Sequence, residues 1–267
     1  MPKSETTLKP EIIAVLADQL YQAEANRVPI NPLTLEHPDL TPVDAYHIQL
    51  AWADRKQAEG AKVAGKKIGL TSKAMQQMLN VNEPDYGHIF DYMVLSDMTA
   101  VDTSALLQPK IEAEVAFVLS SELKGPNVHV ADVLDATAYV VPSIEIIDSR
   151  IKDWKISLPD TIADNGSSAR IVLGGKPTPV YGLDLQLMGM VLEKNGKQIS
   201  TGSGAAALGH PANAIAWLAN KLAEFDISLK PGEIILPGAV AAAVSVEKGD
   251  IITAKFSEIG FVSVTFV

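Results

Sequence analysis

The sequence predicts an α+β protein in which a helical N-terminal segment precedes a core of mixed β-strands. Two stretches near the N-terminus have helical apolar spacing, and from residue 62 onward short β-rich runs alternate with glycine and proline turns. The strand spacing is irregular and the later helices are few, which argues against a β/α barrel. We therefore divide the chain into a helical cap, residues 1–61, and a β-rich core, residues 62–267, which forms one continuous functional unit.

The cap is predicted to contain two helices. The first covers residues 10–26, where the apolar side chains that share a face are Ile12, Ile13, Leu16, Leu20 and Tyr21. Prolines then interrupt regular structure. The second helix begins at Pro42, which follows the N-cap candidate Thr41, and it runs to about residue 59, where Gly60 ends it.

The core is predicted to contain eight strands and two helices. The strands cover residues 63–70, 111–119, 138–147, 169–173, 186–194, 233–236, 251–256 and 260–267. Asn195 and Gly196 form a typical hairpin turn after the fifth of these strands. The helices cover residues 130–136 and 211–225.

Composition excludes several classes of protein. The chain has 267 residues and a net charge of −10, which disfavours nucleic acid and anionic membranes as partners. It contains no cysteine, so thiol nucleophiles, disulfides and metal–thiolate sites are excluded. The N-terminus carries Glu5 and Glu11 without a long apolar stretch, unlike a secretory signal, and no apolar run could span a bilayer. We expect a cytoplasmic protein with no membrane partner.

Three glutamates lie within apolar strand sequences. Glu112 and Glu114 are two residues apart, so a strand projects both from one face, roughly 6–7 Å apart. Glu145 lies between two isoleucines in another strand. Burying such acids together is costly, and a divalent cation would remove the conflict; ligands that are all oxygens suit Mg²⁺ or Mn²⁺. The same alternation also fits the solvated face of a half-exposed strand, and the pattern alone does not decide between the two.

Other polar residues gather in three short segments. Lys67 lies in the glycine-containing run 65–72, and Asp85 lies between Pro84 and Gly87 in a predicted rigid turn. Residues 160–170 form a predicted loop rich in small polar groups. A solvated lysine, a plain turn and a capped turn would also explain these segments. The candidate substrate-binding residues are Leu70, Thr71, Asp164, Ser168 and Arg170.

Several motifs in order make the chain resemble one family over nearly its whole length. It resembles the 2-hydroxypenta-2,4-dienoate (2-keto-4-pentenoate) hydratases and the sister 4-oxalocrotonate decarboxylases of the fumarylacetoacetate hydrolase superfamily. The motifs are GKKIGLTSKAM at 65–75, NEPDYG at 82–87, PKIEAEVAFVL at 109–119, PSIEIIDSRIKDW at 142–154, DTIADN at 160–165 and GSGAAALGHPANAIAWLANKLA at 202–223.

The resemblance implies a mixed β-roll core, a homo-oligomer and a small 2-oxo or 2-hydroxy-dienoic acid as substrate. It implies that Glu112, Glu114 and Glu145 hold Mg²⁺ or Mn²⁺ and that Lys67 and Asp85 are catalytic residues in the pocket. Family members of the two kinds can associate, so the sister enzyme is a candidate partner.

The motifs divide between the two activities. Asp85 within EPDYG resembles the hydratases, which add water to 2-hydroxypenta-2,4-dienoate in the meta-cleavage degradation of aromatic compounds. The segments 167–170 and 238–244 resemble the decarboxylases, which act on 2-oxo-3-hexenedioate, and Arg170 could meet the distal carboxylate of that substrate if it points inward. We favour the hydratase and keep the decarboxylase as the alternative.

Overall fold

The computed structural model describes residues 6–78 and 81–267. The start of the predicted cap, residues 1–5 with Glu5, lies outside the described residues. The helices are α1 (Pro10–Asn26), α2 (Leu33–Glu36), α3 (Pro42–Ala58), α4 (Lys73–Met78), α5 (Val130–Ala136), α6 (Leu158–Ala163) and α7 (Pro211–Leu222). The strands are β1 (Val63–Gly69), β2 (Asp85–Phe90), β3 (Val94–Ser96), β4 (Thr99–Val101), β5 (Lys110–Leu119), β6 (Thr137–Ile147), β7 (Ser168–Leu173), β8 (Gly189–Lys194), β9 (Lys197–Ser203), β10 (Ile234–Leu236), β11 (Val244–Ser245), β12 (Ile251–Phe256) and β13 (Gly260–Phe266).

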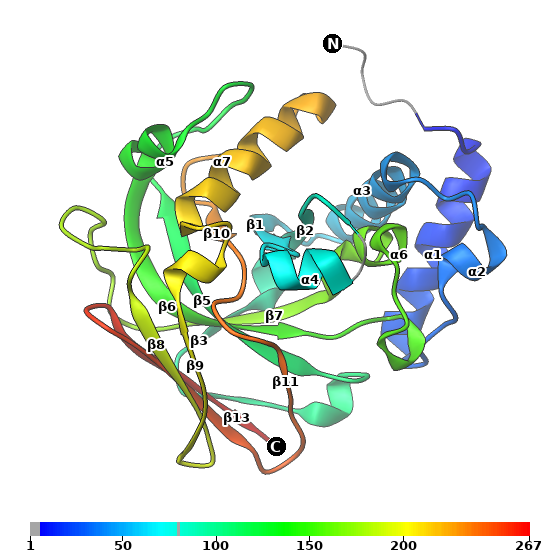
Figure 1. The fold of residues 1–267 in the computed structure, drawn as a ribbon. Coiled ribbons are helices and arrows are strands. Elements are labelled where there is room, and N and C mark those ends of the chain that lie inside the picture. The colour runs from blue at the N-terminus through cyan, green and yellow to red at the C-terminus, as the bar shows by residue number, and fades with distance from the viewer. Residues whose placement is uncertain (1–5, 79–80) are drawn as a thin grey trace.

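Two mixed sheets form the core of the described chain. The larger sheet has the order β2-β1-β10-β5-β6-β7-β3, with β11 paired to β5, and the smaller has the order β4-β13-β12-β8-β9. The long antiparallel strands β5 and β6 curve through the centre of the molecule (Figure 1). Their apolar face, which includes Ile111, Val115 and Phe117, is buried in the core, where β13 packs against β6. The opposite face of the same strands is therefore left for polar side chains.

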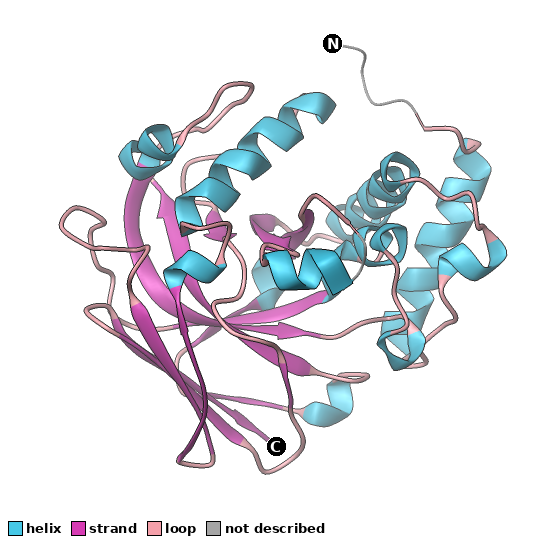
Figure 2. Cartoon of the chain, in the orientation of Figure 1, coloured by secondary structure: helices cyan, strands magenta, loops and turns pink. Residues whose placement is uncertain are grey.

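The N-terminal helices lie together on one side of the sheets (Figure 2). Thr41 caps α3, as the sequence predicted, and the structure adds a reciprocal capping box between Thr41 and Asp44. Gln49 of α3 donates from its side-chain amide to the carbonyl oxygens of Tyr86 in β2 and Ile162 in α6. The helical segment is thus hydrogen-bonded to the elements that flank the site.

The predicted elements recur with small shifts at their ends. The helices at 10–26 and 130–136 are confirmed, and the hairpin at Asn195 joins β8 to β9. The predicted helix 211–225 ends as an α-helix at Leu222 and finishes in a 3₁₀ turn, and the strand predicted from residue 186 begins at Gly189.

Two predictions were wrong about local structure. Asp85 does not lie in a turn but opens β2, where it pairs with Gly69 of β1. The segment 160–170 is not a loop, because it contains most of α6, a 3₁₀ turn and the start of β7. A helix of six residues is too short to show periodicity; α6 is stabilised by contacts of Asp160 with Ser157 and with Thr34, far away in the sequence.

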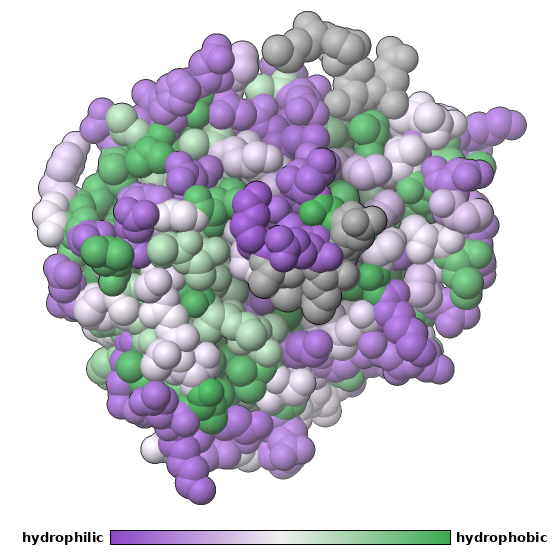
Figure 3. Space-filling view, viewed as in Figure 1, coloured by the Kyte–Doolittle hydropathy of each residue, from purple (hydrophilic) through white to green (hydrophobic). Residues whose placement is uncertain are grey.

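The described surface is mixed in character. On the face shown in Figure 3, hydrophilic and hydrophobic side chains alternate in small patches, which is ordinary for a protein surface. Among residues 6–78 and 81–267, no helix has the combination of length and apolar character that crossing a membrane requires.

Candidate functional site

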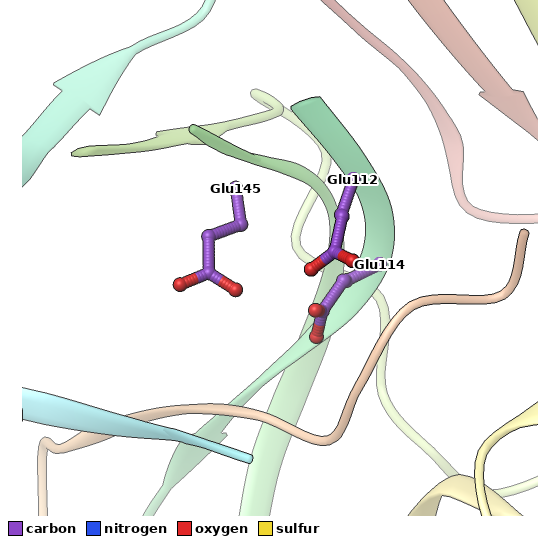
Figure 4. A group of neighbouring side chains, drawn as sticks. All are labelled: Glu112, Glu114 and Glu145. Atoms are coloured by element: carbon purple, nitrogen blue, oxygen red, sulfur yellow. The ribbon is translucent and has the colours of Figure 1, made fainter. Parts of the chain in front are cut away.

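The three glutamates of the sequence prediction meet at one point. Glu112 and Glu145 are direct partners across β5 and β6, and Glu114 follows two residues along β5, so all three project from one face. One carboxylate oxygen of each lies within 4.8 Å of the others (Figure 4). Glu114 and Glu145 are 0% exposed and Glu112 is half-buried. A solvated strand face is therefore excluded.

These carboxylates lack the partners that buried acids need. Glu114 accepts a hydrogen bond from the Gly238 amide at 2.8 Å, but its other oxygen and both oxygens of Glu145 are buried with no hydrogen-bond partner in the described part of the chain. Burial raises the pKa of Glu114 well above its ordinary value and that of Glu145 to about 7, and it also raises the pKa of Glu112.

The chemistry of this donor set fits a divalent cation. Unpartnered buried oxygens are rare and costly, and a cation would use their lone pairs and neutralise their charge. Because all the donors are carboxylate oxygens, a hard ion such as Mg²⁺ or Mn²⁺ suits them best.

Lys67 supplies the nearest positive charge. Its Nζ donates to the Gly166 carbonyl oxygen at 2.9 Å and lies 3.6 Å from Oε2 of Glu145. Burial opposes the charged form, but the surrounding carboxylates, Glu145 foremost, raise the pKa of Lys67 above its ordinary value. The ammonium group is therefore charged and is held against the glutamate cluster.

Asp85 lies on the same face of the sheet, through its pairing with Gly69. Its Oδ2 accepts a hydrogen bond from Thr161 Oγ1 at 3.0 Å, whereas Oδ1 is buried and finds no hydrogen-bond partner among residues 6–78 and 81–267. A Cβ on Gly69 would lie 2.1 Å from that Oδ1 and 3.3 Å from Lys67 Nζ. The absence of a side chain at Gly69 is what allows the carboxylate and the ammonium group to approach one another.

A β-bulge decides which residues of β7 face the site. Arg170 pairs with Ile146 and therefore lies on the face opposite Glu145, where its guanidinium group is 5.7 Å from the Tyr92 ring. The register then shifts by one residue, so that Ser168 pairs with Ile147 and lies on the glutamate face. Ser168 is buried, and its hydroxyl has no hydrogen-bond partner in the described part of the chain. The structure brings Ser168 to the site and leaves Arg170 outside it.

The remaining predicted substrate-binding residues are Asp164, Thr71 and Leu70, and they differ in how they relate to the site. Asp164 is buried, but its carboxylate accepts hydrogen bonds from Arg150, Ser149 and Ser167, so it has little capacity left for a substrate. Thr71 is buried and packs so closely on Gly238 that a Cβ there would lie 2.0 Å from Thr71 Oγ1. Since the Gly238 amide binds Glu114, Thr71 borders the site. Leu70 precedes it with a left-handed backbone, and its carbonyl oxygen accepts a hydrogen bond from the Gln76 side chain.

Sequence reasoning missed several contributors to the site. Thr161, Gly166 and Gly238 were not singled out individually, although each contacts a site residue. Arg150 was missed as well, since nothing in its local sequence shows that it pairs with Asp164. Its sequence neighbours include Asp148, Ser149, Lys152 and Asp153, so the local sequence resembles an exposed polar stretch and gives no signal of its burial.

The sequence is similar to one protein family and to proteins of known activity. The fumarylacetoacetate (FAA) hydrolase C-terminal model matches residues 68–267. A 2-hydroxypent-2,4-dienoate hydratase from Pseudomonas putida is 50% identical over 218 residues, which cover 81% of this chain and 98% of that protein. A 4-oxalocrotonate decarboxylase from Pseudomonas sp. (strain CF600) is 43% identical over 261 residues, 98% of this chain and 99% of that protein.

The chain belongs to the hydratase/4-oxalocrotonate decarboxylase family of the fumarylacetoacetate hydrolase superfamily. A solved member, the 4-oxalocrotonate decarboxylase from Pseudomonas putida G7 in complex with magnesium and adipate, superimposes with a TM-score of 0.96. It is 41% identical and the match covers 98% of this chain and all of that one. The predicted α+β fold with its N-terminal helices is confirmed. The chain is a lyase, either a hydratase or a decarboxylase of the meta-cleavage pathway, and its relatives divide between the two at similar identity.

Proposed function

We propose that this family member is a hydratase that adds water to 2-hydroxypenta-2,4-dienoate and forms 4-hydroxy-2-oxopentanoate. The observation that carries the proposal is the position of Asp85, whose buried Oδ1 is unpartnered within the described chain and lies on the face of Lys67 and the glutamates. Hydration requires proton transfers at carbon and at water, and a free carboxylate oxygen in the pocket can perform them.

Glu112, Glu114 and Glu145 would hold Mg²⁺, with Mn²⁺ as the alternative ion. When bound, such an ion supplies Lewis-acid polarisation of a 2-oxo acid. The charged Lys67 offsets negative charge that develops on the substrate oxygens. Asp85 is the proposed acid and base: it delivers a proton to C5 as the 2-hydroxyl group loses one, then takes a proton from the water that adds at C4 and returns a proton to C3. Ser168, Leu70 and Thr71 border the space in which the substrate lies.

The decarboxylase of 2-oxo-3-hexenedioate is the second candidate. The segments 167–170 and 238–244 favour it, and the relative that superimposes at a TM-score of 0.96 is a decarboxylase. The position of Arg170 removes one argument for the decarboxylase, because its side chain lies on the face opposite the glutamates and does not meet a distal carboxylate there.

A two-substrate ultraviolet assay tests the proposal. Purified protein with Mg²⁺ receives freshly prepared 2-hydroxypenta-2,4-dienoate or 2-oxo-3-hexenedioate, each with and without EDTA. We expect loss of the dienol absorbance that EDTA abolishes, and no CO₂ from the diacid. Release of CO₂ from the diacid, with the dienol unchanged, would establish the decarboxylase instead.

The quaternary state and location stay as predictions. We propose a homo-oligomer in the cytoplasm, with the sister enzyme as a candidate partner, because the family resemblance implies these. The division into a cap at 1–61 and a core at 62–267 is likewise a proposal. Light scattering after gel filtration measures the oligomer, and mixing with the purified sister enzyme tests the association.

A further inference from the structure

The turn between α6 and β7 has an unusual backbone. Asn165, Gly166 and Ser167 follow one another with φ values of 55°, 58° and 54°, all in the left-handed region. That region is unfavourable for residues other than glycine, and two of the three carry side chains. Such a run persists only where its surroundings hold it in place, and strain of this kind gathers at functional sites. The three residues are called the left-handed turn below.

The left-handed turn contacts the catalytic lysine directly. The carbonyl oxygen of Gly166 accepts the hydrogen bond of Lys67 Nζ at 2.9 Å. A Cβ on Gly166 would lie 3.0 Å from Lys67 Cδ and 3.3 Å from Nζ. On the other side, a Cβ on Gly87 of β2 would lie 2.2 Å from the Asn165 carbonyl oxygen. The turn is therefore packed against Lys67 of β1 and against Gly87, the partner of Lys67 in β2, and its position fixes the direction of the ammonium group.

Two sets of contacts hold the turn. The Asn165 side chain accepts from the His88 amide at 2.7 Å and donates to the His88 carbonyl oxygen at 2.9 Å, which ties the turn to β2. The second set centres on the buried ion pair of Arg150 and Asp164, with Nε 2.5 Å from Oδ1. Arg150 also donates to the carbonyl oxygens of Asp164 and Ser168, the residues that precede and follow the turn.

We propose that Arg150 and Asp164 act together as positioning residues, which hold the left-handed turn so that Gly166 fixes Lys67 beside the glutamates. Neither side chain has to touch the substrate. The role assigned to Asp164 from the sequence, substrate binding, is thereby replaced by one that uses the bonds its carboxylate makes. The inference rests on the proposed function in one respect only: it takes Lys67 as a group on which turnover depends.

A second buried ion pair serves as a matched control for Arg150 and Asp164, and its lysine lies on β1, the strand that carries Lys67. Lys66 forms a buried ion pair with Glu233, at 2.9 Å, on the face of β1 that points away from the glutamates. Breaking either ion pair leaves a buried charge without its partner, so a variant of either pair should have a lower melting temperature than the wild type. Only the Arg150–Asp164 pair is connected to Lys67 through the turn.

The test compares Asp164→Asn with Glu233→Gln. We expect Asp164→Asn to lower kcat by roughly tenfold to a hundredfold, as small displacements of catalytic groups do. The Kd for Mg²⁺, measured by calorimetry without substrate, should stay within about threefold, because the three glutamates are untouched. Glu233→Gln should lower the melting temperature and leave kcat within about twofold. An unchanged kcat in Asp164→Asn, or an equal loss in both variants, would overturn the proposal.

A second variant covers the case in which Asp164→Asn does not fold. Arg150→Lys keeps the charge pair but loses the planar fork that reaches the two carbonyl oxygens. In its crystal structure with Mg²⁺, we expect Lys67 Nζ to lie beyond about 3.5 Å from the Gly166 oxygen, the limit of a hydrogen bond. A distance still near 2.9 Å, with wild-type kcat, contradicts the inference. If the wild type turns over neither substrate, the proposed function fails, and this distance still decides the positioning.

Discussion

Lys66 and Lys67 are neighbours in β1 and are almost equally buried, at 3% and 4% exposed, yet their surroundings differ completely. Lys66 donates to both oxygens of Glu233, at 2.9 and 3.1 Å, so one positive charge meets one negative charge. On the opposite face, burial raises the pKa of all three glutamates, and Lys67 is the one cation among the described residues that lowers the pKa of each of them. Asp85 adds a fourth carboxylate near Lys67.

The difference separates a structural ion pair from a site. The Lys66–Glu233 pair satisfies its own charges, whereas the Lys67 face keeps an excess of negative charge and unpartnered carboxylate oxygens within the described chain. Unpaired negative charge in the interior destabilises the fold, so the stability of the protein does not explain why it is there. A cation and a substrate are the groups that can complete it, and this is why the excess indicates function.

The largest effect is expected from Glu145→Gln. The variant removes one charge from the glutamate cluster, so Mg²⁺ affinity should fall sharply and turnover should fall on the order of a thousandfold or more, since a Lewis acid contributes several kcal/mol. Calorimetric titration with Mg²⁺ and the dienol assay measure the two effects. Retained turnover at wild-type Mg²⁺ concentration would exclude Glu145 as a ligand.

A somewhat smaller effect is expected from Asp85→Asn. The amide keeps the shape of the side chain but cannot exchange the proton, so kcat should fall by about a hundredfold or more. Binding of Mg²⁺ should change little, because Asp85 is not part of the glutamate cluster. Steady-state kinetics and the Mg²⁺ titration check this together. Unchanged turnover would remove Asp85 from its acid and base role.

The variants Lys67→Met and Lys66→Met test directly whether the two lysines have different roles. We expect Lys67→Met to lower kcat by roughly a hundredfold, because the charge that faces the substrate is lost. Lys66→Met should instead destabilise the fold by about 3–5 kcal/mol, since Glu233 is left buried without a partner. Urea denaturation and kinetics on both variants measure the contrast. Equal losses of activity would show that the two faces are not functionally distinct.

The smallest expected effect is the pH dependence that His88 contributes to stability. Burial, with the nearby Lys66 charge, lowers the pKa of His88 from 6.5 to about 3, so the fold favours the neutral ring. The stabilisation from this group is complete above pH 6.5 and is lost as the pH falls toward 3, by at most about 1.4 kcal/mol per pH unit. Urea denaturation of Mg²⁺-free protein between pH 7 and pH 4.5 measures this. The free energy of unfolding should fall less steeply with falling pH in His88→Leu than in the wild type. Parallel curves for variant and wild type would contradict this prediction.

Residues that follow regular alternation could be predicted from the sequence. Glu112 and Glu114 share a face because strands alternate, and Thr41 caps its helix through a local motif. Ser168 and Arg170 could not be placed in this way, because the bulge between Ile146 and Ile147 shifts the register by one residue. The partners of Asp164 were equally out of reach, since its geometry is set by an arginine whose role appears only after folding.

Three glycines surround Lys67 and its neighbours, Gly69, Gly87 and Gly166, and each lies where a Cβ would meet another atom at 3.0 Å or closer. A glycine can be enlarged by mutation but never trimmed, so these three positions offer evolution no way to make more room beside Lys67. Adaptation to a longer substrate has to proceed from another side. The segment that starts at Gly238 reaches Glu114 through its backbone and carries small exposed alanines further on, so laboratory evolution should concentrate its library there.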